Sequence, residues 1–236
     1  MRRTLFILAL AAVVAVAAGA TALGATHVST VDPAGFSARV DNPWFPLQPG
    51  TTYVYTGTKD GKPARDVLQV THRTATIDGA PCVVVKDRLY LSGRLEERTT
   101  DWYTQDRKGN VWYFGEQTSS ALDKSGKPVT RGTWKAGVDG AKPGIYMFAN
   151  PRVGQQAQQE FYKGQAEDHF QVLSLRSPVT VPYVSSKNAL LTKEWTPLEP
   201  GVLDHKLYVR GIGTVLEEAV KGGTERLALV SVHRGA

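Results

Sequence analysis

The chain has 236 residues, a formal net charge of +6 and one cysteine. This length is enough for one sizeable hydrophobic core, and a single thiol excludes a framework of intramolecular disulfides. The basic residues are spread along the chain instead of forming a patch, so we expect no nucleic-acid partner. We also expect a monomer.

The N-terminus has the pattern of a secretory signal. The basic pair Arg2-Arg3 precedes Leu5–Ala25, a run of apolar and small residues without a charge. Small residues at Ala20 and Ala22 suit cleavage there, so residues 1–22 are predicted to be a signal peptide and the mature protein secreted or extracytoplasmic. The alternative is an uncleaved N-terminal anchor, since about 20 apolar residues can span a bilayer. No second apolar run follows, so we expect no stable membrane insertion after cleavage.

The remaining chain predicts one β domain. Residues 23–42 form a polar lead-in without periodicity, and residues 43–236 are predicted to be a single domain. The domain opens with Pro43–Gly50, an aromatic and proline segment that we expect to close one end of a barrel. Turn sequences such as Asp60-Gly61 then recur between strand-like runs at intervals of about 8–12 residues. This spacing predicts an all-β, antiparallel barrel or sandwich, lipocalin-like, with about ten strands in hairpins.

Cysteine and histidine offer no metal site. Cys82 stands in the apolar run Pro81–Val85, which predicts a buried and inert core residue. The five histidines are widely spaced, and no C-x-x-C pair occurs, so no metal is predicted. Nucleotide loops and the G-x-S-x-G elbow of serine hydrolases are also missing from the sequence, and we predict no cofactor.

The most informative segment is Leu95–Glu116, because it carries more aromatics and carboxylates than a packing strand needs. Two strands are expected here, Arg94–Gln105 and Asn110–Thr118, joined by a turn in which Asp, Gly and Asn favour reversal. In a plain hairpin Trp102 and Trp112, or their neighbours, would approach each other.

Strict alternation along the second strand makes a specific prediction about its two faces. Trp112, Phe114 and Glu116 would share one face, and Val111 and Tyr113 the other. A carboxylate among aromatics is either a rim residue in water or an inward acid with a pKa raised by desolvation.

Four segments resemble a group of secreted bacterial β-rich proteins. They are Phe45-Pro46-Leu47-x-Pro49-Gly50, Asp101–Glu116, Ala136–Gly144 and Ala166-Glu167-Asp168. The resemblance covers nearly the whole mature chain and implies an exported single domain, but it transfers no catalytic residue. The proline-aromatic opening also resembles other exported β-rich barrels of lipocalin-like shape.

Two sets of residues are candidates for a site. Paired carboxylates can hydrolyse a glycoside, bind Ca²⁺ through oxygen ligands or form a structural ion-pair network. The catalytic candidates are Asp101, Glu116, Glu160, Glu167 and Asp168. Aromatics bury large areas and often anchor ligands. The ligand-binding candidates are Glu96, Trp102, Trp112, Phe114, Trp134 and His205.

Two hypotheses of function follow. The favoured one is an exported β-domain that binds an apolar, sugar-like or cell-envelope ligand through a pocket lined by aromatics and carboxylates. The alternative is a secreted acid–base enzyme, a hydrolase or isomerase, that uses paired carboxylates on a carbohydrate or lipid. Convergence of three or more of the candidate acids in one concave pocket is the observation that would favour the enzyme.

Overall fold

The computed structural model describes residues 31–122, 128–129 and 132–235, and the predicted signal peptide lies outside them. The described part is all-β, as predicted, with one short 3-10 helix. Its strands outnumber the ten expected, because several short ones join the long hairpins. The elements are η1 (Pro33–Gly35), β1 (Phe36–Ser37), β2 (Thr51–Lys59), β3 (Lys62–Ile77), β4 (Ala80–Leu91), β5 (Arg94–Asp106), β6 (Val111–Leu122), β7 (Pro128–Val129), β8 (Trp134–Lys135), β9 (Lys142–Met147), β10 (Gln156–Gln158), β11 (Glu160–Phe161), β12 (His169–Thr180), β13 (Ser185–Trp195), β14 (Leu203–Val209), β15 (Gly213–Lys221) and β16 (Arg226–Arg234).

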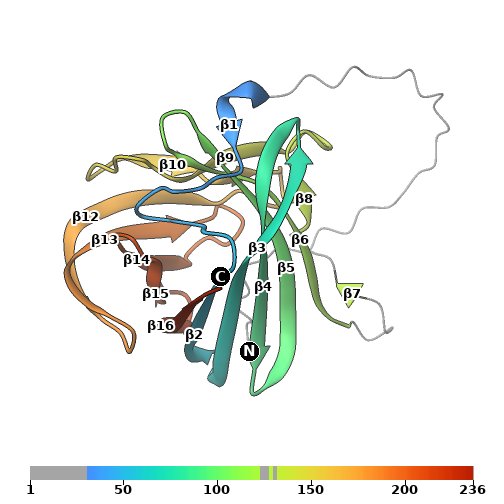
Figure 1. Ribbon diagram of the computed structural model, residues 1–236. Coiled ribbons are helices and arrows are strands. Elements are labelled where there is room, and N and C mark those ends of the chain that lie inside the picture. Colours follow the sequence, from blue (N-terminus) through green and yellow to red (C-terminus); the bar gives the residue numbers. More distant parts are fainter. Residues whose placement is uncertain (1–30, 123–127, 130–131, 236) are drawn as a thin grey trace.

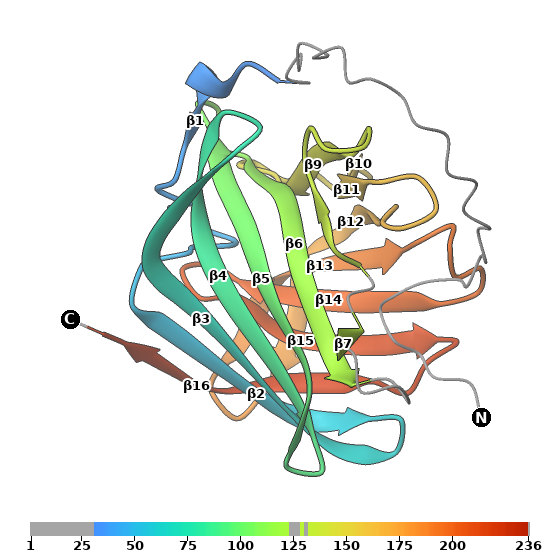
Figure 2. The same ribbon diagram turned by 90° about the vertical axis from the view of Figure 1, so that its right-hand side faces the viewer.

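The long strands form one antiparallel sheet that curls into a nearly closed barrel. Their order is β10-β12-β13-β14-β15-β16-β2-β3-β4-β5-β6-β9-β11. In Figure 1 the strands β12–β16 and β2–β6 are two curved halves that face each other. In Figure 2 the strands β3–β6 run steeply and β13–β16 run closer to horizontal, so the two halves cross at a large angle.

The chain itself closes the remaining gap in the barrel. β10 pairs with β12 at one edge of the sheet, and β11 pairs with β9 at the other. Gln159 is the single residue that joins β10 to β11, and its backbone N–H donates to the carbonyl of Asp168 at 2.7 Å. Gly144 of β9 lies against this link, where a Cβ atom would meet the carbonyl carbon and oxygen of Gln159 at 2.6 Å. The close approach therefore requires glycine.

The folded part starts before Pro43. Within the expected lead-in, η1 and β1 are ordered elements, and Phe36 and Ser37 pair with β5. The Phe36 ring makes edge contacts with Trp112 and Phe114 at 5.7 and 5.2 Å between centroids. This packing covers the outer face of β6 near the Asp106–Asn110 turn.

The segment Pro43–Gly50 crosses to the other half of the barrel. The Pro43 carbonyl accepts a hydrogen bond from the N–H of Gly211, in the turn between β14 and β15. Phe45 is buried and packs against Tyr103 and Tyr146, with centroid distances of 5.4 and 4.6 Å. The segment thus brings an aromatic side chain into the interior of the barrel.

The close packing of Gly144 against the β10–β11 link provides a test of barrel closure. We expect Gly144→Ala to lower the free energy of unfolding by about 1–3 kcal/mol, since the added methyl group displaces the Gln159 backbone. Urea denaturation measures the loss. The matched control is Gly35→Ala, because a Cβ atom at Gly35 meets nothing within 4 Å. Equal stability of the two variants would contradict the close packing of β9 against the β10–β11 link.

The buried thiol gives a second test. Cys82 is fully buried, and burial raises its pKa to about 12. A neutral thiol without solvent access reacts slowly, so the native protein should resist a thiol reagent at pH 8 and react fully only in denaturant. Rapid labelling of the native protein would show that β4 is accessible from solvent.

Candidate functional site

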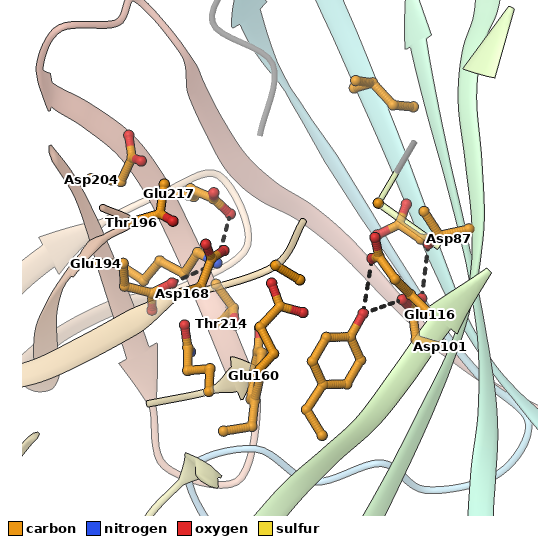
Figure 3. A pocket seen from close by; sticks show the side chains of 18 of the residues that line it. Asp87, Asp101, Glu116, Glu160, Asp168, Glu194, Thr196, Asp204, Thr214 and Glu217 are labelled. Atoms are coloured by element: carbon orange, nitrogen blue, oxygen red, sulfur yellow. Dashed lines mark hydrogen bonds and ion pairs between the residues drawn. The ribbon is translucent and has the colours of Figure 1, made fainter. Parts of the chain in front are cut away.

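A cavity of about 290 Å³ lies inside the barrel, between its two halves. Its lining is unusually acidic: twelve of the described acidic residues reach it, with one lysine. In Figure 3 carboxyl groups from the two halves point toward each other across the space, with Glu160 between them. The acids are Asp66, Asp87, Glu97, Asp101, Glu116, Glu160, Asp168, Glu194, Glu199, Asp204, Glu217 and Glu225.

Strand alternation explains the convergence. Side chains two residues apart share a face of a strand, and most strands of the barrel place at least one acid on the inner face. Two groups result, and we name them by their place. The acidic wall, on β3–β6, consists of Asp66, Asp87, Glu97, Asp101 and Glu116. The lysine wall, on β13–β15, consists of Glu194, Asp204, Lys206 and Glu217.

A β-bulge on β6 decides which residues face the cavity. Trp102 pairs with Gly115, but the next residue, Tyr103, pairs with Tyr113, so Phe114 is the extra residue. Gly115 has φ of 138°, and a Cβ atom there would meet the Trp134 carbonyl oxygen at 2.5 Å. The bulge turns Tyr113 and Glu116 toward the same side.

The predicted faces of this strand are therefore wrong. Strict alternation put Glu116 beside Trp112 and Phe114, whereas it shares the cavity with Tyr113. The Trp112 indole instead donates to the Asp106 carboxylate at 3.0 Å, and Phe114 is fully buried against Phe36. Trp102 and Trp112 are not directly opposite each other, because Trp112 pairs with Thr104, but their neighbours Tyr103 and Tyr113 do pair across the hairpin, as the prediction allowed.

The hydroxyl group of Tyr113 joins two carboxyl groups. Asp101 and Glu116 are directly opposite each other on β5 and β6. The Tyr113 oxygen lies 2.8 Å from Asp101 Oδ1 and 3.0 Å from Glu116 Oε2. A phenol has one proton to donate, so both contacts are hydrogen bonds only when one of the two carboxyl groups is protonated and donates to the phenol oxygen.

The pKa values of the acidic wall agree with a shared proton. Burial, followed by the charge of Asp87, raises the pKa of Asp101 to about 7. Burial and the Asp101 charge raise the pKa of Glu116 well above its ordinary value. Burial raises the pKa of Glu97 to about 7 as well. Desolvation and nearby like charges both disfavour the ionised form of a carboxyl group, so closely spaced buried carboxyl groups retain protons.

Asp66 and Asp87 form a second pair on the same wall. Burial is the main cause that raises both pKa values, and the charge of Asp66 raises that of Asp87 further. Their mutual hydrogen bonding lowers the pKa of Asp66 and raises that of Asp87, as is expected when one proton is held between two carboxyl groups.

The lysine wall contains a counter-charge from the chain itself. Lys206 Nζ lies 3.0 Å from Glu194 Oε2 and 3.6 Å from Glu217 Oε2. Glu194 also accepts a hydrogen bond from Tyr208 at 3.1 Å. Although burial opposes the charge, these two carboxylates raise the pKa of Lys206 well above its ordinary value. The ammonium group therefore stays charged inside the barrel.

Aromatic rings complete the lining. Tyr103 and Tyr113 stack with their centroids 4.7 Å apart, and Tyr146 meets both rings edge-on. Phe45 and Tyr55 also reach the cavity. Flat rings beside hydrogen-bonding groups are typical of sites for small ligands.

Two polar atoms of the lining have no hydrogen-bond partner among the described residues. They are Nε2 of Gln159, a residue with 4% of its surface exposed, and Oε2 of Glu97. Leaving a buried polar atom unpaired costs about 1–3 kcal/mol. Both residues line the cavity, so a rotation of either side chain would present a donor or an acceptor to a molecule there.

The structure brings together four of the five acids predicted from the sequence. Asp101, Glu116, Glu160 and Asp168 line the cavity, and burial and the charge of Asp168 raise the pKa of Glu160. Glu167 does not line it and instead accepts a hydrogen bond from the Gly164 N–H at 2.6 Å.

None of the six predicted ligand-binding residues lines this cavity. Trp102 lies under the Lys135 ammonium group, 4.8 Å from its ring centre, and Trp134 packs edge-on against Tyr113. Glu96 and His205 occupy the opposite strand face from the cavity residues next to them in sequence. Trp112 and Phe114 lie under Phe36, as described above.

Eight of the twelve acids of the cavity were not among the candidates predicted from the sequence. A signal was present in the alternation of acids with other inward residues, as in Glu97, Asp101 and Tyr103, or Asp204, Lys206 and Tyr208. Each pattern taken alone resembles an exposed polar strand face. Only the closure of the sheet turns these faces inward.

Neither a metal centre nor a membrane-spanning helix is found in the described part of the chain. No group of three or more His, Cys, Asp or Glu side chains there is arranged to hold a metal ion. No helix in the same residues is long and apolar enough to cross a membrane.

The crowded carboxyl groups predict an unusual pH dependence. Glu97, Asp101 and Asp204 have pKa values of about 7 in the folded state, against about 4 in an unfolded chain. Between these values the folded state binds more protons, so the free energy of unfolding falls as the pH rises. We expect at least about 1 kcal/mol more stability at pH 5.5 than at pH 7.5.

Urea denaturation at the two pH values measures this difference. Asp101→Asn should reduce it, and Glu96→Gln, a change on the outer face of the same strand that contributes least to the raised pKa of Glu97, should leave most of it in place. Higher stability at pH 7.5 than at pH 5.5 would show that the acids of the cavity are neutralised in another way.

Comparisons with known proteins find partial similarity to solved structures. No protein-family model matches the sequence, and neither does any curated protein. One similar solved structure is a Bacteroides fragilis protein with a YmcC-like fold that is thought to be exported, with 15% identity, a TM-score of 0.47, and coverage of 81% of this chain and 99% of that one. Another is a protein of Parabacteroides distasonis thought to be a lipoprotein, with 12% identity, a TM-score of 0.45, and coverage of 80% and 98%.

Proposed function

We propose that the protein is an exported β-domain whose internal cavity binds one small, sugar-like ligand. The observation that carries this proposal is the pair of unpartnered polar atoms on the cavity wall, Gln159 Nε2 and Glu97 Oε2. A hydroxyl group both donates and accepts hydrogen bonds, so a polyhydroxylated ligand satisfies both atoms at once. Export is supported by the signal pattern in residues 1–22.

The composition of the lining argues against a purely apolar ligand. Such a ligand would strip water from the carboxyl groups without replacing their hydrogen bonds, which is costly. A sugar supplies hydroxyl donors to the acids and an apolar ring face to Tyr103, Tyr113 and Tyr146. A volume of about 290 Å³ is at the small end of ligand pockets, which are roughly 300–1,000 Å³, and suits a single small molecule.

A second candidate function is acid–base catalysis on the same ligand class. The convergence of four predicted acids in one cavity is the observation that favours it. Catalytic carboxyl pairs have environments that push their two pKa values apart, for example by sharing one proton. Asp101 and Glu116 also share a proton through Tyr113, and the pKa of each is raised, so the assay for product described below decides between binding and catalysis.

A thermal-shift screen with mono- and disaccharides tests the proposed function. A ligand at about 100 times its Kd stabilises the folded state by about 2.7 kcal/mol, which corresponds to a rise in Tm on the order of 5–10 °C for a chain of this size. We expect Gln159→Ala to reduce this shift, because it removes the donor that faces the ligand, while the fold is retained.

Glu96→Gln is the matched control and should give the full shift. Undiminished binding by Gln159→Ala would place the site outside the cavity. Samples incubated with each sugar are also analysed for hydrolysed or isomerised product, and product that is formed by the wild type but not by Asp101→Asn would establish the second candidate.

A further inference from the structure

We propose that the ligand of this cavity carries an ammonium group, which binds among the carboxyl groups of the acidic wall. The inference rests on the proposed function and adds that the ligand is positively charged. The chemical class is that of small amino sugars.

The barrel interior already holds ammonium groups in this way. Lys206 lies between Glu194 and Glu217 with only 12% of its side chain exposed. Lys59 forms a 2.6 Å ion pair with Glu225, and both side chains are less than a tenth exposed. Three acids in the same interior thus form ion pairs with the chain's own ammonium groups.

The acidic wall differs from these two places. Within the described residues, no Lys or Arg forms an ion pair with Asp66, Asp87, Asp101 or Glu116. Protons take the role of the cation there, one between Asp101 and Glu116 through the Tyr113 hydroxyl and one between Asp66 and Asp87. An ammonium group supplies a full charge and up to three donors, and it would replace a shared proton directly.

Gln159 is an independent indication that a molecule binds here. Its side chain is nine-tenths or more buried, it lines the cavity, and its Nε2 atom has no partner among the described residues. An amide N–H requires an acceptor oxygen, which a bare amine does not have. A ligand that carries both an ammonium group and hydroxyl or ring oxygens fits Gln159 and the acidic wall together.

An organic cation fits better than a metal ion. Calcium takes six to eight oxygen ligands at short range, and no described cluster of three acids has the required arrangement. The rings of Tyr103, Tyr113 and Tyr146 pack against one another and all three residues line the cavity, so a cation or a sugar ring bound there would lie beside aromatic side chains.

Binding of a cation should be coupled to the release of a proton. The groups that face the Asp101–Glu116 pair are Asp66, Asp87 and Glu97 on the same wall, Tyr103, Tyr113 and Tyr146 as neutral phenols, and Glu160, Glu194, Lys206 and Glu217 across the cavity. The incoming charge stabilises the ionised form of the pair, so the shared proton passes to the buffer.

Isothermal titration calorimetry of the full mature chain tests the proposal with matched probes. Glucosamine, galactosamine and the β-1,4-linked glucosamine disaccharide are each compared with the N-acetylated form, which is neutral. At pH 6.5 the best amine should bind at least tenfold more tightly than its acetylated form. Titration in two buffers with different ionisation enthalpies should show the release of about one proton per bound ligand.

Substitutions test whether the ammonium group of the ligand binds at the acidic wall. Glu116→Gln should weaken binding of the amine at least tenfold while any binding of the acetylated form is retained, and Glu96→Gln should bind as the wild type does. Asp101→Asn is the second variant of the wall and should behave like Glu116→Gln.

The outcomes separate the two proposals. Equal or tighter binding of the acetylated sugars, without proton release, overturns the ammonium proposal and leaves sugar binding standing. Tight binding of amines that is unaffected by both wall variants also overturns it. If no probe of either set binds at 10 mM, a concentration on the order of the weakest specific affinities, both proposals fail.

Discussion

The crowding of carboxyl groups inside a nearly closed barrel is the constraint on which the rest of this structure depends. Charges that leave water must be paired, protonated or held by hydrogen bonds, because an isolated buried charge costs too much free energy. The barrel uses all three solutions. Lys206 and Lys59 pair with acids, the Tyr113 hydroxyl joins Asp101 to Glu116, and Asp66 shares a proton with Asp87.

These solutions divide the interior into unequal halves. In the lysine wall, Lys206 pairs with Glu194 and Glu217 and supplies a counter-charge from the chain itself. In the acidic wall, no described Lys or Arg forms an ion pair with Asp66, Asp87, Asp101 or Glu116, so the charge of this wall depends on the protons that it holds and therefore on pH. In the proposed function, such a site trades stability of the free protein near neutral pH for affinity toward a cation, a common relation between stability and function.

The bulge on β6 connects the local sequence to this chemistry. Without the extra residue at Phe114, Tyr113 and Glu116 would lie on opposite faces of the strand, and the phenol could not reach both carboxyl groups. Gly115 makes the bulge possible, since its backbone conformation and the nearby Trp134 carbonyl exclude a side chain. The same bulge leaves Trp112 and Phe114 to pack outward under Phe36.

The sequence alone determined the class of fold and the hairpin that carries the site. Alternating strand-like runs, the Asp60-Gly61 turn and the Asp106–Asn110 turn are local signals, and local backbone preferences are enough to produce them. Four of the five predicted acids also proved to share one cavity, because Asp101 and Glu116 are close in the hairpin and Glu160 and Asp168 flank the link that closes the barrel.

Only the tertiary structure decided which side chains face inward. A bulge shifts the alternation of a strand by one residue, and nothing in the pattern at Trp112–Glu116 signals it unambiguously. The register between distant strands likewise cannot be deduced from the sequence of any one segment. The sequence therefore could not predict that Asp66 and Asp87 lie across the cavity from Glu194 and Glu217. The acids became a site because closing the sheet turned ordinary polar strand faces into an interior.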